Sequence, residues 1–273
     1  MKRLLALLAG LLLAACAGPQ AFQPTGKIEV LWLGQSAFRV TTLTGKVIVI
    51  DPWLRTNPKT PAQYKELAAL GKVDVVLVTH AHFDHVADAP ALAKMNNARL
   101  YSPGGLNATL VKLGEMPANL APGMNKSGVV TPLGPEIKFT MVRAEHSSEF
   151  TWKDPATGRE TVLPGGEPVG WIIELENGFT IYHMGDTGLF GDMRMIGELY
   201  RPDLILIPIG GNFTINAQKA AFATRSYLRP KFAIPMHYGT FPILAGKPED
   251  YVKEIGGAPT KVIVPQPGEK VVF

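Results

Sequence analysis

The feature that most constrains this 273-residue sequence is a cluster of histidines and one aspartate directly behind an apolar run. The run Val73–Thr79 reads VDVVLVT, which is typical of a strand buried on both faces. Helical residues two apart lie on opposite sides, so His80 and His82 can converge only where the chain turns beyond the strand. Imidazoles and carboxylates are ligands that zinc and similar divalent metals prefer. The cluster therefore predicts a metal site, and the alternative is a polar loop with incidental histidines. Its residues are His80, Ala81, His82, Phe83, Asp84 and His85.

Three further candidate ligands follow other apolar segments in the same way. His146, Asp186 and His237 each lie close behind an expected strand. A lone histidine at a strand end is more often a structural residue whose ring is hydrogen-bonded by its neighbours. The cluster at residues 80–85 reverses this expectation, because it needs further ligands from elsewhere in the chain.

From Ile28 onward, strand-like and helix-like segments alternate, which favours one α/β domain over residues 28–273. The expected strands are Ile28–Leu33, Ala37–Val40, Val47–Ile50, Val73–Thr79, Ala98–Ser102, Ile137–Val142, Val169–Leu175, Phe179–Tyr182, Leu204–Pro208, Phe232–Pro235 and Lys261–Val264. The expected helices are Pro61–Leu70, Ala87–Asn96 and Ala217–Tyr227. Residues 103–135 hold five Pro and six Gly and show no clear pattern. Residues 152–167 predict either a hairpin or a lid near the site.

The first sixteen residues have the pattern of a bacterial lipoprotein signal peptide. Lys2 and Arg3 precede an apolar run of 12 residues, too short for the roughly 20 that a membrane-spanning helix needs. The run ends in Leu-Ala-Ala-Cys at Cys16, the only cysteine of the chain. We expect a signal peptide over residues 1–15, then a Cys16 carrying acyl chains such as palmitate, with a flexible tether over 16–27. The alternative is an ordinary signal peptide cut near the same alanines.

This start predicts an exported protein that is lipid-anchored in the cell envelope. Ala17 lacks the carboxylate that favours retention in the inner membrane, so the outer membrane, facing the periplasm, is expected. Processing would remove Lys2 and Arg3 and no acidic residue, which lowers the formal net charge from +4 to +2. No block of Lys and Arg stands out, so nucleic acid is not an expected partner. A single cysteine also excludes an internal disulfide and a Cys-rich zinc site.

Taken together, the motifs resemble the metallo-β-lactamase superfamily, in particular the small metal-dependent hydrolases related to ascorbate-6-phosphate lactonase. The resemblance extends from about Ile28 to Ile255 and implies one αββα sandwich domain. The motifs that carry it are Gly34–Phe38 (GQSAF), Ile50–Leu54 (IDPWL), His80–His85 (HAHFDH), His146–Ser148 (HSS), Ile181–Met193 (IYHMGDTGLFGDM), Ile207–Gly210 (IPIG) and His237–Pro242 (HYGTFP).

The resemblance also implies how the ligands are shared between two divalent metal ions. His80, His82 and His146 would hold the first ion, Asp84, His85 and His237 the second, and Asp186 would bridge the two. Zinc is expected first, with Mn²⁺ or Fe²⁺ as alternatives. A metal-bound hydroxide would then cleave an ester, lactone or phosphoester of a small-molecule or lipid-like substrate.

Other residues are candidates for supporting roles. Asp84 could also orient the attacking water or accept its proton. His183 is either a structural residue or a substrate contact. Tyr238 and Asn212 could stabilise a developing oxyanion, or could serve only in packing and turns. Asp51 and Asp88 are candidates to accept hydrogen bonds from ligating imidazoles, and for Asp51 the alternative is a turn-forming residue.

Three alternative functions remain beside the hydrolase. The chain could be a metal-binding envelope lipoprotein or scaffold without significant turnover, although the complete ligand set favours an enzyme. It could be a β-lactamase, but Asp186 stands where those enzymes usually have cysteine or another non-bridging residue. It could be a nuclease of the same fold, which export and the near-neutral charge disfavour.

Overall fold

The computed structural model describes residues 24–273. The expected signal peptide, Cys16 and most of the tether lie outside the described residues. Within residues 24–273, no helix combines the length and the apolar character needed to cross a membrane.

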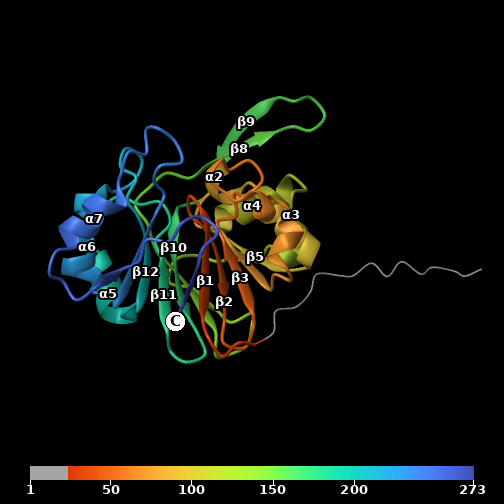
Figure 1. The fold of residues 1–273 in the computed structure, drawn as a ribbon. Coiled ribbons are helices and arrows are strands. Elements are labelled where there is room, and N and C mark those ends of the chain that lie inside the picture. The colour runs from red at the N-terminus through yellow and green to blue at the C-terminus, as the bar shows by residue number, and fades with distance from the viewer. Residues whose placement is uncertain (1–23) are drawn as a thin grey trace, which may run out of the picture.

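Two β-sheets pack face to face and helices cover the outer face of each, so the chain forms the expected αββα sandwich (Figure 1). The first sheet has the strand order β15 (Lys270–Val272), β1 (Glu29–Gly34), β2 (Ala37–Thr41), β3 (Val47–Ile50), β4 (Val75–Leu77) and β5 (Arg99–Tyr101). Its helical elements are α1 (Ala62–Lys65), η1 (Leu67–Leu70), α2 (Phe83–Val86), α3 (Ala89–Asn96), α4 (Gly104–Lys112) and η2 (Ala118–Leu120).

The second sheet is built from the later part of the chain, and three helices cover it (Figure 1). Its strand order is β14 (Lys261–Val262), β13 (Phe232–Met236), β12 (Leu204–Pro208), β11 (Thr180–His183), β10 (Val169–Glu174), β7 (Lys138–Arg143) and β6 (Val129–Val130). Its helical elements are α5 (Met193–Tyr200), α6 (Ala217–Ala223), the π-helical turn η3 (Thr224–Leu228) and α7 (Pro248–Ile255).

The two sheets are joined directly behind the histidine cluster. Trp171 of β10 is buried between the sheets, and its indole Nε1 donates to the carbonyl of Val78, 3.1 Å away. The backbone N–H of Val169 donates to the carbonyl of Thr79 at 3.0 Å. These bonds fix the end of β4 against the second sheet, so side chains that follow strands of both sheets meet at one edge.

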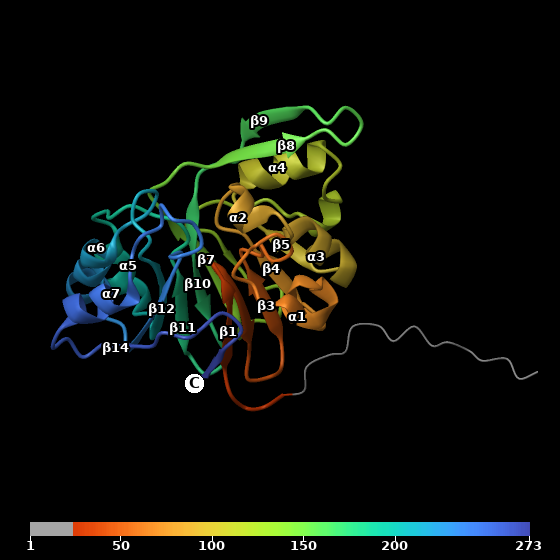
Figure 2. The same ribbon diagram turned by 45° about the horizontal axis from the view of Figure 1, so that its top comes forward.

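Of the hairpin and the lid expected for residues 152–167, the structure shows a hairpin, whose strands cover residues 149–164. Strands β8 (Glu149–Lys153) and β9 (Glu160–Pro164) pair with each other and lie over α4 (Figures 1 and 2). A Cβ on Gly105 of α4 would lie only 2.8 Å from Cα of Gly166, so glycine allows the close approach. The hairpin is thereby docked on the first layer of helices.

Several elements differ from the sequence-based expectations. The predicted strand Val73–Thr79 is regular only over Val75–Leu77, because the chain begins to turn toward the site beyond it. The predicted helix Ala217–Tyr227 is divided into α6 and a π-helical turn. Four observed α-helices, α2, α4, α5 and α7, are absent from the prediction.

Candidate functional site

Residues His80–His82 of the cluster lie in a turn between a strand and a helix, as the spacing of the two histidines predicts, and Phe83, Asp84 and His85 belong to the helix. Strand β4 ends at Leu77, and helix α2 begins at Phe83 directly after His82. The turn brings the ring nitrogens His80 Nε2 and His82 Nδ1 to 3.0 Å from each other. His146, which follows β7, completes a group whose ligand nitrogens all lie within 4.8 Å of one another.

The hydrogen bonds behind these rings decide which nitrogens carry protons. Thr79 Oγ1 donates to the Asp51 carboxylate at 2.7 Å, so it accepts from His80 Nδ1 at 3.0 Å. His82 Nε2 lies 3.1 Å from Glu149 Oε2 and donates to that carboxylate. In neutral rings, these bonds leave two lone pairs facing each other, on His80 Nε2 and His82 Nδ1. A cation between them is the arrangement that this pattern fits.

The second group consists of four buried side chains, Asp84, His85, Asp186 and His237. Asp186 Oδ1 lies 3.3 Å from His85 Nε2, and Asp186 Oδ2 lies 2.9 Å from His237 Nε2. Asp186 Oδ2 is also 3.7 Å from His146 Nε2, so this carboxylate lies between the two groups. His85 Nε2, Asp186 Oδ1 and both ring nitrogens of His237 are buried and find no hydrogen-bond partner among the described residues. Buried nitrogen and oxygen atoms without hydrogen-bond partners are suitable ligand atoms for a metal ion.

Asp51 orients the His85 ring from behind. Its Oδ2 lies 2.8 Å from His85 Nδ1, while its Oδ1 accepts the backbone N–H of Thr79 at 2.7 Å. Nδ1–H therefore donates to Asp51, and His85 presents its Nε2 lone pair to the other ligands. Asp51 thus makes the contact expected of it, with the ring of a candidate ligand.

The charges of the site follow from burial and from these short distances. Burial lowers the pKa of His80 well below its ordinary value, and the neighbouring His85 lowers it further. Burial opposes the charged form of His237, yet the Asp186 and Asp84 carboxylates raise its pKa to about 9. Burial alone would raise the pKa of Asp84, but the nearby charges of His85 and His237 lower it to about 2. The second group thus holds ionised carboxylates whose charge a divalent cation could balance in place of protons.

Backbone geometry supports this convergence. A Cβ on Gly185 would lie 2.8 Å from Cβ of Thr79, so glycine lets the loop of Asp186 approach the end of β4. Asp51 and His237 have φ angles of 48° and 55°, in the left-handed region that non-glycine residues seldom adopt. Strained backbone of this kind is concentrated at functional sites.

Three residues proposed for supporting roles belong to neither ligand group. His183 is buried, its Nε2 donates to the Ser36 carbonyl at 2.9 Å, and its Nδ1 accepts the N–H of Gly185 at 3.2 Å. Of the two expectations for His183, the structure therefore favours the structural one. Neither Tyr238, whose ring packs 5.5 Å from that of Trp32, nor the exposed Asn212 lines the cavity at the ligands.

The expectation for Asp88 requires a correction. Its Oδ2 accepts the backbone N–H groups of Leu54 and Arg55 at 2.7 and 3.0 Å, and its Oδ1 lies 3.1 Å from Arg55 Nε. Within residues 24–273 no hydrogen bond joins Asp88 to an imidazole. Asp88 instead organises the loop that follows Asp51.

Sequence reasoning missed Gln35 and Glu149, and also Thr79, among the residues that contact candidate ligands. Gln35 Nε2 donates to Asp84 Oδ2 at 2.9 Å, and the Gln35 carbonyl accepts the backbone N–H of His237 at 3.1 Å. Glu149 binds His82 from the first strand of the hairpin. Gln35 directly follows a strand, within the GQSAF motif, and that position could have identified it as a candidate site residue. The position of Glu149 beside His82 depends on how the hairpin docks.

A cavity of about 580 Å³ lies over both ligand groups. Its polar lining comes from the candidate ligands together with Gln35 and Ser147, whereas residues 149–167 do not line it. Its apolar lining is supplied by Phe83, Phe213, Phe241, Ile243 and Leu244. This volume is in the range of small-molecule binding sites.

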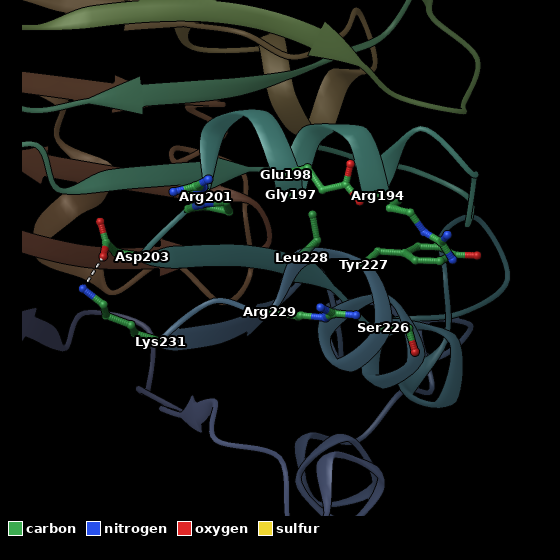
Figure 3. Close-up of a pocket in the computed structure, with 11 residues that line it drawn as sticks. Arg194, Gly197, Glu198, Arg201, Asp203, Ser226, Tyr227, Leu228, Arg229 and Lys231 are labelled. Atoms are coloured by element: carbon green, nitrogen blue, oxygen red, sulfur yellow. Dashed lines mark ion pairs between the residues drawn. The ribbon is translucent and has the colours of Figure 1, made fainter.

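A second cavity, of about 570 Å³, lies between α5 and η3 and shares no residue with the first (Figure 3). Arg194, Arg201, Arg229 and Lys231 line it together with acidic side chains, and Lys231 Nζ lies 2.8 Å from Asp203 Oδ1. It contains none of the candidate metal ligands. The cavity at the strand ends is therefore the candidate active site.

Both the sequence and the fold match known proteins. Residues 46–238 match the model of the Beta-lactamase superfamily domain. The chain is 61% identical over 275 residues to a UPF0173 metal-dependent hydrolase of Cupriavidus necator, covering 96% of this chain and 95% of that protein. It is 58% identical to a UPF0173 metal-dependent hydrolase of a Polaromonas species, over 100% of both chains. Among solved structures, Igni18, a metallo hydrolase of Ignicoccus hospitalis, is 35% identical with a TM-score of 0.76, covering 90% of this chain and 98% of that one.

Proposed function

The chain belongs to the beta-lactamase superfamily and to its UPF0173 metal-dependent hydrolases, and from this premise we propose that it hydrolyses an ester, lactone or phosphoester at a dinuclear centre. The observation that carries the proposal is the pair of adjacent ligand groups with the Asp186 carboxylate between them. A lone structural histidine would not need this arrangement, and a protein that only stored a metal would not need an apolar cavity above it.

The residues present fit two divalent ions. His80, His82 and His146 would hold one ion and Asp84, His85 and His237 the other, with Asp186 contacting both. When bound, such ions lower the pKa of a shared water and polarise the oxygen under attack. Nitrogen and carboxylate ligands make zinc the first candidate, with Mn²⁺ and Fe²⁺ as alternatives.

The protein's own side chains position these groups and handle the proton. Gln35 fixes one oxygen of Asp84 beside the cavity, where the ionised carboxylate can orient the attacking water and accept its proton. Asp51 and Glu149 fix the tautomers of His85 and His82. The proposed likeness to ascorbate-6-phosphate lactonase makes lactones one class to test beside aryl esters and phosphodiesters.

Metal removal tests the proposal as a whole. A purified protein comprising residues 24–273 is expected to hydrolyse at least one of an aryl ester, a lactone and bis(p-nitrophenyl) phosphate. A chelator should abolish this turnover, and added Zn²⁺ or Mn²⁺ should restore it. Because metal binds the folded state, a metal concentration a thousandfold above Kd should raise Tm by about 10 °C. The absence of metal-dependent turnover on all three classes would contradict the proposed function.

For the part of the chain before residue 24, we propose a lipid anchor on Cys16 that holds the protein in the outer membrane, facing the periplasm. In a Gram-negative host, the full chain should incorporate labelled palmitate and sediment with outer membranes. Cys16→Ser should abolish both, and Ala17→Asp should move the labelled protein to the inner membrane. Unchanged sedimentation of an unlabelled Cys16→Ser protein would contradict the anchor.

A further inference from the structure

The walls of the active-site cavity combine exposed apolar side chains with few charges. Phe83, Phe213 and Ile243 are 59%, 58% and 52% exposed, although they come from three separate segments of the chain. Large apolar side chains that gather around one opening mark a binding site for apolar matter. They lie at the cavity that holds the candidate ligands.

Part of this apolar wall is held in place by aromatic packing. The buried Trp53 contacts Phe83 edge to face, with ring centres 5.4 Å apart, and stacks on Phe241 at 5.8 Å. The rings of Phe83 and Phe241 are 6.4 Å apart. Such pairs are stable arrangements of aromatic rings, so this part of the wall is pre-formed and a ligand need not order it.

The charged side chains of the cavity also indicate an apolar, uncharged ligand. Its only acidic side chains, Asp84 and Asp186, belong to the ligand groups, and no Lys or Arg is among the described residues that line it. A phosphate remote from the reacting bond is normally bound by such cations. The cationic side chains of the second cavity, in Figure 3, lie around a different site.

We propose that the cavity takes a neutral ester or lactone with an apolar acyl or aryl group, which lies against Phe83, Phe213 and Ile243. The inference rests on the proposed function and narrows its substrate class. It excludes substrates that carry a phosphate remote from the reacting bond. In the reaction, the oxygen of water bonds to the carbonyl carbon and the acyl C–O bond breaks. One proton of the water goes to the leaving alcohol oxygen, the other is released to solvent, and the acyl group leaves as a carboxylate.

The chain-length dependence of turnover tests this assignment. With the metal-loaded protein, kcat/KM for p-nitrophenyl esters should rise about tenfold or more from acetate to octanoate, because each buried methylene favours binding by up to about fourfold. A neutral γ-lactone with a long alkyl chain should likewise be preferred over γ-butyrolactone and over 6-phosphogluconolactone. The double variant Phe213→Ser/Ile243→Ser should lower the octanoate-to-acetate ratio to about threefold or less. The double variant Met195→Ser/Leu199→Ser is the matched control, since both residues are exposed on α5, and it should keep the wild-type ratio.

A binding measurement separates this inference from the proposed hydrolysis. The neutral fluorescent probe N-phenyl-1-naphthylamine should bind the metal-loaded protein, and Phe213→Ser/Ile243→Ser should weaken its binding about tenfold while the α5 control does not. Probe binding with that loss, but no turnover of any ester or lactone, would uphold the apolar site and overturn hydrolysis. Turnover without chain-length dependence, or a preference for the phosphorylated lactone, would overturn the apolar site and leave hydrolysis standing.

Discussion

Replacing Asp186 by asparagine is expected to lower kcat/KM by about a thousandfold or more. Asp186 is the carboxylate that approaches both ligand groups, with one oxygen 2.9 Å from His237 Nε2 and 3.7 Å from His146 Nε2. Asparagine keeps the shape but substitutes an amide nitrogen, which cannot bind a cation, for one oxygen. The variant should therefore fold and lose metal at the shared position.

The measurement is kcat/KM together with metal content per chain after dialysis against metal-free buffer. Asp192→Asn is a suitable control, because Asp192 lies in the same part of the chain but is half exposed and pairs with Arg143 at 3.3 Å. The control should keep wild-type turnover and metal content. A fully metallated and fully active Asp186→Asn protein would refute the shared role of this carboxylate.

Replacing Asp51 by asparagine is expected to lower metal affinity and kcat/KM by about a hundredfold. The introduced side-chain amide would donate to His85 Nδ1, whereas the wild-type carboxylate accepts from it at 2.8 Å. The ring would then carry its proton on Nε2, the atom that faces Asp84 and Asp186, and could not ligate there. Loss of the 2.7 Å bond from Thr79 Oγ1 should also lower the free energy of unfolding by about 2 kcal/mol.

Asp88→Asn distinguishes this effect from general damage to the loop. Asp88 is nearly buried and binds the same loop, but its partners are the backbone N–H groups of Leu54 and Arg55 and the exposed Arg55 side chain. Asparagine can still accept the backbone bonds, so activity should change by no more than about threefold. Equal losses in the two variants would show that Asp51 acts through the loop and not through the His85 tautomer.

The seven candidate ligands could be found from the sequence because each follows an apolar segment. In a sandwich whose layers meet at one edge, position behind a strand is enough to bring His80, His146 and His237 together. The role of Asp51 followed from the same logic. Spacing does not say which way a side chain points, however, and His183 shows the consequence. It lies three residues before Asp186, yet it is buried with both ring nitrogens bonded to backbone.

The contacts of Gln35 and Glu149 depended on tertiary packing and carried weaker signals. Gln35 reaches Asp84 because the turn after β1 lies beside the loop of His237. Local residue types do not predict which distant segments pair with each other. The expectation for Asp88 rested on its short distance along the chain from His85. It was wrong because the Asp88 carboxylate faces the loop after Asp51.

For the fold, strands rich in Val and Ile were predictable and some helices were not. Helix α4 begins with Gly104 and Gly105, residues that lower helix propensity, and the reason for Gly105 is the hairpin that packs against it. The helix predicted over Ala217–Tyr227 is α-helical only over α6, and its last turn is the π-helical η3. The close approach at Gly105 comes from residues distant in sequence, which a local pattern does not contain.

The most direct test of the account is a crystal structure of the zinc-loaded protein with anomalous diffraction measured at the zinc edge. We expect two anomalous peaks per chain, one within reach of His80, His82 and His146 and the other within reach of Asp84, His85 and His237, with Asp186 contacting both. A chain with no peak among these residues, or with one metal held elsewhere, would contradict the dinuclear centre on which the proposed hydrolysis depends.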